Sequence, residues 1–206
     1  MKQQFLNLCL KIGCSENCNA AFEKMLLQYM IPKRFYHTFE GHVAFCLHEL
    51  EKIPAEYTCD RDAIAMALFM HDAVMNFTAK NNEERSAEFS EKLCQEIKAP
   101  QEFIAKVTKL ILATQHKTPQ EDTDEQIIAD IDLAILGQEK EIYDACERNI
   151  YLEYSFVPED IFKRERFKFL HNLLGRKRIY QTSYFKNNYE ARARKNILRS
   201  IEALGQ

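Results

Sequence analysis

Apolar residues recur at helical spacing along almost the whole chain. Within residues 37–53 the apolar positions share one face of a helix: Val43, Cys46, Leu47, Leu50 and Ile53. Pro54 ends that pattern, and Asp60 is predicted to cap the start of the next helix. The stretch 63–70 is apolar on every side, which is typical of a helix in the middle of a bundle.

The same periodicity predicts helices along the rest of the chain: 82–97, 101–115, 124–136, 139–155, 159–174, 187–203 and two more before residue 31. Three prolines mark breaks between helices: Pro100, Pro119 and Pro158. Gly137 is predicted to serve as a helix C-cap. No run alternates with period two over a length that would predict a strand, so the pattern predicts an all-α fold.

The composition agrees with one helical domain. Among 206 residues there are five Gly and five Pro, too few for a disordered or loop-dominated β protein. The seven Cys are scattered and form no CxxC pair, so neither a disulfide scaffold nor a zinc ribbon is expected. There is no convincing signal peptide and no apolar stretch of about 18 residues. We expect a soluble, cytoplasmic domain over residues 1–206, with a core at about 30–137 and a helical extension at about 138–206.

Charge is distributed unevenly, although the whole chain carries only −3. Residues 1–160 hold 16 Lys and Arg against 28 Asp and Glu, whereas residues 161–206 hold 12 against 3. A basic segment of this kind either meets an anionic partner such as nucleic acid or packs beside an acidic body. Most aromatic residues between the basic ones sit at helical core spacing, and no helix-turn-helix or RNP pattern is present. We therefore favour packing and do not expect a nucleic-acid partner.

Two stretches place ionisable residues in apolar surroundings. His71 and Asp72 follow directly on the apolar run 63–70. In the run 127–136, the helical neighbours of Asp132 at three and four residues are all apolar, whereas Asp130 has Gln126 on one side. Burying a carboxylate costs several kcal/mol unless an arginine, a hydrogen-bond network or a metal ion compensates it. Asp132 is therefore predicted to be the buried acid of this pair.

His42 opens the apolar face of its predicted helix. Together with His71, Asp72 and Asp132 it gives imidazole and carboxylate groups on three helices. Such mixed ligands suit Mn, Fe, Co, Ni or Zn, and bundle cores are a recurrent place for metal sites. Taken singly, each residue also fits a structural role, as a core histidine, a helix cap or an ion-pair member.

The order His42, His71-Asp72, Asp132 resembles the H…HD…D signature of the HD-domain superfamily of metal-dependent phosphohydrolases. Seven phrases resemble one bacterial branch of predicted HD phosphohydrolases: Arg34–Thr38, Phe69–Val74, Asn82–Ala87, Ile111–His116, Asp130–Gly137, Glu153–Tyr154 and Arg176–Tyr180. The resemblance spans about residues 30–200. In one departure, His37 and His42 are five residues apart, where the family usually has four. Either histidine then remains a candidate ligand, and we favour His42.

The resemblance implies an HD-domain-like helical bundle with a basic helical C-terminal extension. It also implies a divalent metal ion (Mn, Mg, Fe, Co, Ni or Zn) bound by His42, His71, Asp72 and Asp132. Such an ion lowers the pKa of a water molecule and neutralises charge on a phosphoryl group. In the cyclic nucleotide phosphodiesterases, which share the HD arrangement, a Tyr-His motif comparable to the one at His37 supplies the proton donor to the leaving oxygen. Capping of a helix start is the alternative role for His37.

Four further residues are candidates for catalysis or phosphate binding. Glu83 would orient the attacking water or bind a second metal, although acidic residues are also common in the first turn of a helix. His116 would contact phosphate or join a second metal, or it simply complements a helix C-terminus. Arg34 and Lys117 are candidate phosphate contacts. Cys46, one turn from His42, is predicted to be an inert core thiol.

The expected function is a metal-dependent phosphohydrolase that cleaves a phosphate ester or anhydride of a small nucleotide-like substrate. The alternative is a non-catalytic metal-containing HD scaffold that binds a nucleotide or a protein. No P-loop, GxSxG or GxGxxG motif points to another enzyme class. No membrane partner is expected, and the sequence does not determine the oligomeric state.

Overall fold

The computed structural model describes residues 1–57, 60–117 and 120–205. Cys59 and the predicted break at Pro119 lie outside these residues. All regular elements of the described residues are helical, which confirms the all-α prediction. The chain divides into two compact units, Met1–Ala129 and Asp130–Gln206. The division falls inside the helix α7 (Thr123–Asp132), earlier than the expected end of the core near residue 137.

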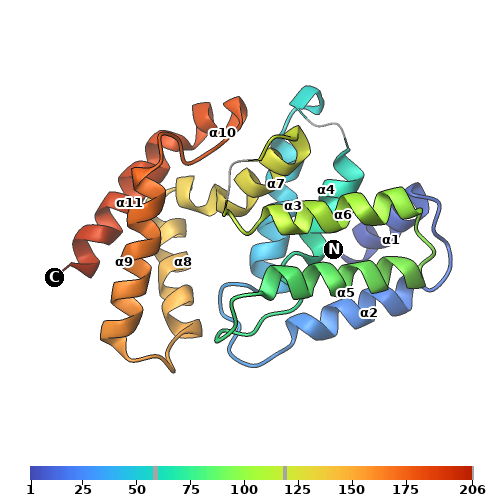
Figure 1. Ribbon diagram of the computed structural model, residues 1–206, viewed down its shortest axis with the longest axis horizontal. Helices are drawn as coiled ribbons and strands as arrows, with labels where there is room; N and C mark the ends of the chain where they lie inside the picture. The colour runs from blue at the N-terminus through green and yellow to red at the C-terminus, as the bar shows by residue number, and fades with distance from the viewer. Residues whose placement is uncertain (58–59, 118–119, 206) are drawn as a thin grey trace. The chain divides into compact units, whose positions relative to one another are not determined.

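Helices α1 to α6 build the first unit (Figure 1). Their bounds are α1 (Lys2–Lys11), α2 (Cys18–Tyr29), α3 (Ala44–Lys52), α4 (Arg61–Met70), α5 (Asn82–Glu96) and α6 (Gln101–Ala113). A π-helical turn, η1 (Phe39–Val43), leads directly into α3, and a 3-10 turn, η2 (Ala55–Tyr57), follows it. The predicted helix 37–53 is therefore a π turn and an α-helix in series.

Helix α4 is the centre of the first unit, as its all-round apolar pattern predicts. Every residue from Ala63 to Met70 except Ala65 is fully buried, and α4 packs against α1, α3, α5 and α6. Its start is capped as predicted, because the Asp60 carboxylate accepts a hydrogen bond from the Ala63 N–H at 2.9 Å. The C-terminal end of this rigid helix carries His71 and Asp72.

The second unit contains α8 (Lys140–Glu153), α9 (Glu159–Gly175), α10 (Ser183–Asn188) and α11 (Glu190–Leu204) after the 3-10 turn η3 (Leu133–Gly137). Helix α11 packs against α9, α10 and η3. Three arginines of the basic segment 161–206 form ion pairs with acidic residues of the same unit: Arg166 with Glu147, Arg192 with Glu139 and Arg199 with Asp144. Part of the basic charge is thus neutralised inside this unit.

Gly137 ends η3, but a left-handed C-cap is not the reason for a glycine there. Its backbone does not have a positive φ. A Cβ atom at this position would lie 2.7 Å from Cβ and 2.9 Å from the carbonyl oxygen of Tyr189. Glycine is required because the chain between α10 and α11 passes close to η3.

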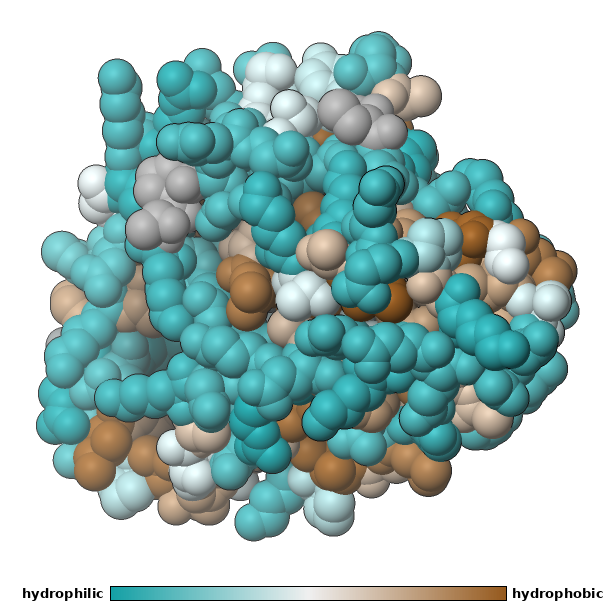
Figure 2. Space-filling model, turned by 45° about the vertical axis from the view of Figure 1, so that its right-hand side comes forward, coloured by the Kyte–Doolittle hydropathy of each residue, from teal (hydrophilic) through white to brown (hydrophobic). Residues whose placement is uncertain are grey.

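Hydrophilic residues cover most of the face drawn in Figure 2, and hydrophobic residues emerge there in separate small areas. Throughout residues 1–57, 60–117 and 120–205, every helix falls short of the length and apolar character needed to cross a bilayer.

Candidate metal centre

Two imidazole rings and a carboxylate meet where η1 lies beside the end of α4. The Nε2 atoms of His42 and His71 lie 3.1 Å apart. The Asp72 Oδ2 atom lies 3.3 Å from Nε2 of His71 and 3.5 Å from Nε2 of His42. Both histidines are buried, and the Asp72 side chain is 14% exposed. These three groups come from segments that all belong to the first unit.

These separations fit a shared divalent cation. Metal bonds to imidazole nitrogen or carboxylate oxygen are about 2.0 to 2.2 Å long, so adjacent ligand atoms around one ion lie about 3.0 to 3.5 Å apart. All three observed distances fall in that range. Two unprotonated Nε2 atoms at such a distance repel each other through their lone pairs. A proton or a metal ion shared between them removes that repulsion.

A backbone carbonyl on the far side of the ring determines the tautomer of His71. Its Nδ1 atom lies 2.9 Å from the carbonyl oxygen of Leu68, on the last turns of α4. Because this carbonyl only accepts, Nδ1 carries the hydrogen and Nε2 keeps its lone pair toward His42. Metal-binding histidines usually have such a contact on their other ring nitrogen, since it holds the ring in position.

The π turn η1 sets the position of His42. The Val43 N–H donates to the carbonyl of Thr38 at 3.2 Å, a bond that spans five residues in place of the four of an α-helix. The Thr38 hydroxyl caps this turn by accepting from the Gly41 N–H at 3.0 Å. The five-residue spacing of His37 and His42 therefore includes most of this π turn.

Of the two candidate histidines, His42 belongs to the ligand cluster and His37 lies beside it. The His37 ring is half-buried, with its centroid 5.7 Å from that of His42. The Tyr36 ring contacts both imidazoles, with its centroid 4.7 Å from that of His37 and 4.8 Å from that of His42. This agrees with the preference for His42 as ligand.

Arg34, a candidate phosphate contact, is buried and faces backbone carbonyls in this structure. Its side chain is buried, and its guanidinium donates to the carbonyls of His37, Asp72 and Ala73 at 2.7 to 2.8 Å and to that of Gln28 at 3.4 Å. The guanidinium therefore ties the segment before the π turn to the turn after α4 through its two Nη atoms.

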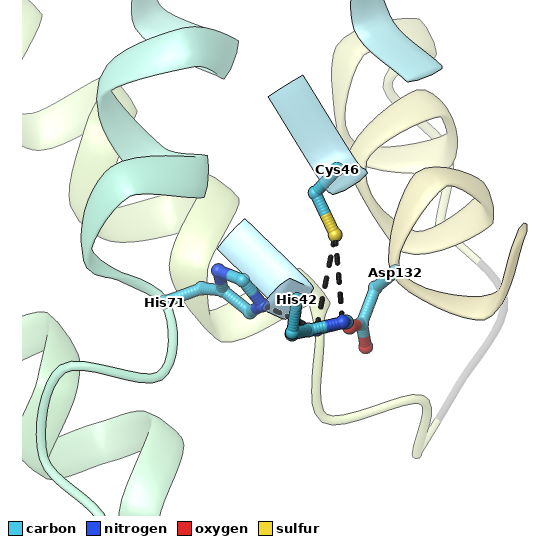
Figure 3. Close-up of side chains that lie close together, drawn as sticks. All are labelled: His42, Cys46, His71 and Asp132. Carbon is cyan, nitrogen blue, oxygen red and sulfur yellow. Dashed lines mark hydrogen bonds between the residues drawn. The ribbon is translucent and has the colours of Figure 1, made fainter. Parts of the chain in front are cut away.

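A sulfur atom joins the histidine pair. Potential ligand atoms of His42, Cys46 and His71 all lie within 4.8 Å of one another (Figure 3). Asp132, the last residue of α7, belongs to the second unit. Cys46 lies one helical turn after His42 and is fully buried. Sequence reasoning treats Cys46 as inert, although its i, i+4 spacing from His42 is a signal for a shared face.

The two aspartates of α7 differ from the sequence expectation. Asp130, with 1% exposure, is the more buried one, and Asp132 is half-buried. The Asp130 carboxylate accepts hydrogen bonds from the Gln181 N–H, the Thr182 N–H and the Thr182 hydroxyl at 2.7 to 2.8 Å. Apolar neighbours along α7 were a poor guide to burial, because residues distant in the sequence cover Asp130.

The remaining candidates lie outside the ligand group. Lys117 is exposed and forms an ion pair with Glu84 at 3.2 Å. The pKa of Glu84 is held below its ordinary value by a hydrogen bond from the Glu84 backbone N–H and by the contact with Lys117. His116 has a left-handed backbone with a φ of 54°. Among the described residues, the group of mutually close ligand atoms contains neither Glu83 nor His116. It does not contain Asp72 either, although Asp72 Oδ2 lies within 3.5 Å of both histidine nitrogens.

No protein-family model matches the chain, nor does any curated protein or solved structure. The functional assignment therefore depends on the geometry of the site and on the sequence resemblance.

Proposed function

We propose that this chain is a metal-dependent phosphohydrolase of the HD type. In this proposal His42, His71, Asp72 and Asp132 bind a divalent cation, and the substrate is a phosphate ester or anhydride of small, nucleotide-like character. The observation that carries the proposal is the triangle of His42 Nε2, His71 Nε2 and Asp72 Oδ2, with sides of 3.1 to 3.5 Å.

The site has the features that hydrolysis at a cation requires. When bound, a divalent cation makes water a stronger nucleophile near neutral pH and stabilises negative charge on a phosphoryl group. The burial of His42 and His71 keeps both rings in one orientation. The carbonyl of Leu68 keeps the lone pair of His71 directed at the site. The Asp72 side chain is 14% exposed, so it lies closer to the surface than the two buried histidines.

His37 is the proposed proton donor to the leaving oxygen. Its ring contacts Tyr36 and lies next to His42, and its half-buried position gives it access to a substrate. Glu83 is proposed to orient water, and His116 and Lys117 to contact phosphate. Arg34 is not part of this proposal, because its side chain is buried and both Nη atoms donate to backbone carbonyl oxygens.

The first test is metal binding. Protein stripped with a chelator should bind about one equivalent of Mn²⁺, Co²⁺ or Zn²⁺ in equilibrium dialysis, if one ion occupies the triangle. Asp72→Ala should abolish that binding and leave the helical circular dichroism largely unchanged. His48→Ala is the matched control, since His48 lies on α3 but is 64% exposed and contacts Glu51.

The second test is turnover. Metal-loaded protein is screened against nucleotides and generic phosphate esters for phosphate release that requires the ion. Release by the wild type and the His48→Ala variant, but not by Asp72→Ala, supports hydrolysis. Metal binding without turnover of any substrate points instead to the non-catalytic scaffold. Turnover that persists in metal-free Asp72→Ala protein would contradict the proposed mechanism.

A further inference from the structure

The thiol of Cys46 is placed beside the histidine pair. Its Sγ atom lies 3.7 Å from Nε2 and 3.8 Å from Nδ1 of His42. Together with His42 and His71 it forms a group of mutually close potential ligand atoms within the first unit (Figure 3). Cys46 is fully buried and lies in the first turn of α3, which follows directly on the π turn that contains His42.

We propose that Cys46 is a thiolate ligand of the cation, so that the site selects Zn²⁺, Co²⁺ or Fe²⁺ over Mg²⁺. This inference rests on the metal site of the proposed function and names the class of ion that occupies it. Coordination forms a metal–sulfur bond, and the S–H proton leaves to water.

The distances agree with this role. A zinc–sulfur bond of about 2.3 Å and a zinc–nitrogen bond of about 2.0 to 2.1 Å put sulfur and nitrogen about 3.6 Å apart in a tetrahedral site. The Cys46 sulfur lies 3.7 Å from Nε2 of His42, the atom that also faces His71.

The donor set decides which ion binds. Imidazole and thiolate prefer borderline and soft cations, whereas Mg²⁺ prefers oxygen ligands and dehydrates reluctantly. Two imidazoles and one thiolate therefore favour zinc-like ions. A site with the same histidines and aspartates but no sulfur would discriminate less strongly against Mg²⁺.

Cobalt substitution tests the proposal directly. Chelator-treated protein is titrated with Co²⁺, and its absorption spectrum is recorded. A thiolate ligand gives an intense sulfur-to-Co²⁺ charge-transfer band in the near ultraviolet, which imidazole and carboxylate ligands do not give. We expect this band in the wild type, its loss in Cys46→Ser and its retention in Cys94→Ser. Cys94 is the matched control, because it is equally buried but lies on α5 outside the ligand group.

Two outcomes separate this inference from the proposed function. If wild-type protein binds Co²⁺ without the charge-transfer band, the Cys46 assignment is overturned and the metal site stands. If wild-type protein binds no Co²⁺, the Cys46 assignment and the proposed metal site are both overturned.

Competition between Zn²⁺ and Mg²⁺ gives a second readout. Cys46→Ser should lower Zn²⁺ affinity by about 10- to 100-fold, and unchanged Zn²⁺ affinity in the folded variant would overturn the assignment.

Discussion

The Thr38 hydroxyl and the Gly41 backbone approach each other so closely that a Cβ atom on residue 41 would displace the hydroxyl. The hydroxyl oxygen accepts the Gly41 N–H at 3.0 Å, and a Cβ atom on Gly41 would lie 2.6 Å from the same oxygen. This contact closes the π turn that carries His42. The position of a proposed metal ligand thus depends on a residue that binds nothing itself.

Gly41→Ala should therefore weaken metal binding. The added methyl group displaces the Thr38 side chain, which removes the cap and costs about 1 to 2 kcal/mol of folding free energy. We expect metal affinity in isothermal titration to fall by about tenfold or more, because His42 moves with the turn. Gly175→Ala is the control, since no atom lies within 4 Å of its added Cβ. Wild-type affinity in a folded Gly41→Ala protein would contradict this role of the turn.

Arg34→Met should destabilise the first unit. The variant leaves the carbonyls of His37, Asp72 and Ala73 without their charged donor and removes the guanidinium that stacks over the Tyr29 ring at 4.7 Å. We expect the free energy of unfolding in urea to fall by about 2 to 4 kcal/mol. Arg148→Met, at an exposed position on α8, should change it by about 0.5 kcal/mol or less. If Arg34→Met were as stable as the wild type, the contacts of the Arg34 guanidinium would have no energetic role.

Asp130 and Asp132 should respond oppositely to substitution by asparagine. Asp130→Asn weakens three hydrogen bonds to a carboxylate, so we expect a loss of about 2 to 4 kcal/mol in unfolding free energy with metal affinity retained. Asp132→Asn should lower metal affinity and leave stability nearly unchanged. Chemical unfolding and metal titration of both variants check this pair. The reverse pattern would remove Asp132 from the ligand set.

Stability should decline at alkaline pH. Burial raises the pKa of the Cys94 thiol from 9.0 to about 12, and it also raises the pKa of Cys9. The unfolded chain then releases these protons at lower pH than the folded protein, so stability is complete below pH 9.0 and falls as the pH rises toward 12. In urea unfolding, Cys94→Ala should flatten this decline by up to about 1.4 kcal/mol per pH unit. Near pH 7 the unfolding free energy of Cys94→Ala should differ from that of the wild type by an amount that does not change with pH. If the two proteins lost stability equally steeply at alkaline pH, the role given to the Cys94 thiol would be contradicted.

The all-α fold and its central helix followed from the sequence alone. Helical periodicity is a local property, and a helix that is apolar on every side, such as 63–70, is stable only when it is buried in the core. The Asp60 cap is likewise local, because its acceptor lies three residues from the N–H that it satisfies. His71 and Asp72 were identified for the same reason, as polar residues at the end of a buried helix.

Tertiary structure decided the details of the site. The sequence favoured burial of Asp132, yet Asp130 is covered by Gln181 and Thr182, some 50 residues away. It offered Arg34 as a phosphate contact, yet the carbonyls of Asp72 and Ala73 take its donors. It dismissed Cys46, whose sulfur lies beside two histidines. Hydrophobic periodicity determines which segments are helices, but a polar group acquires its role from the groups that surround it. Those groups come from distant parts of the chain, so only the folded protein brings them together.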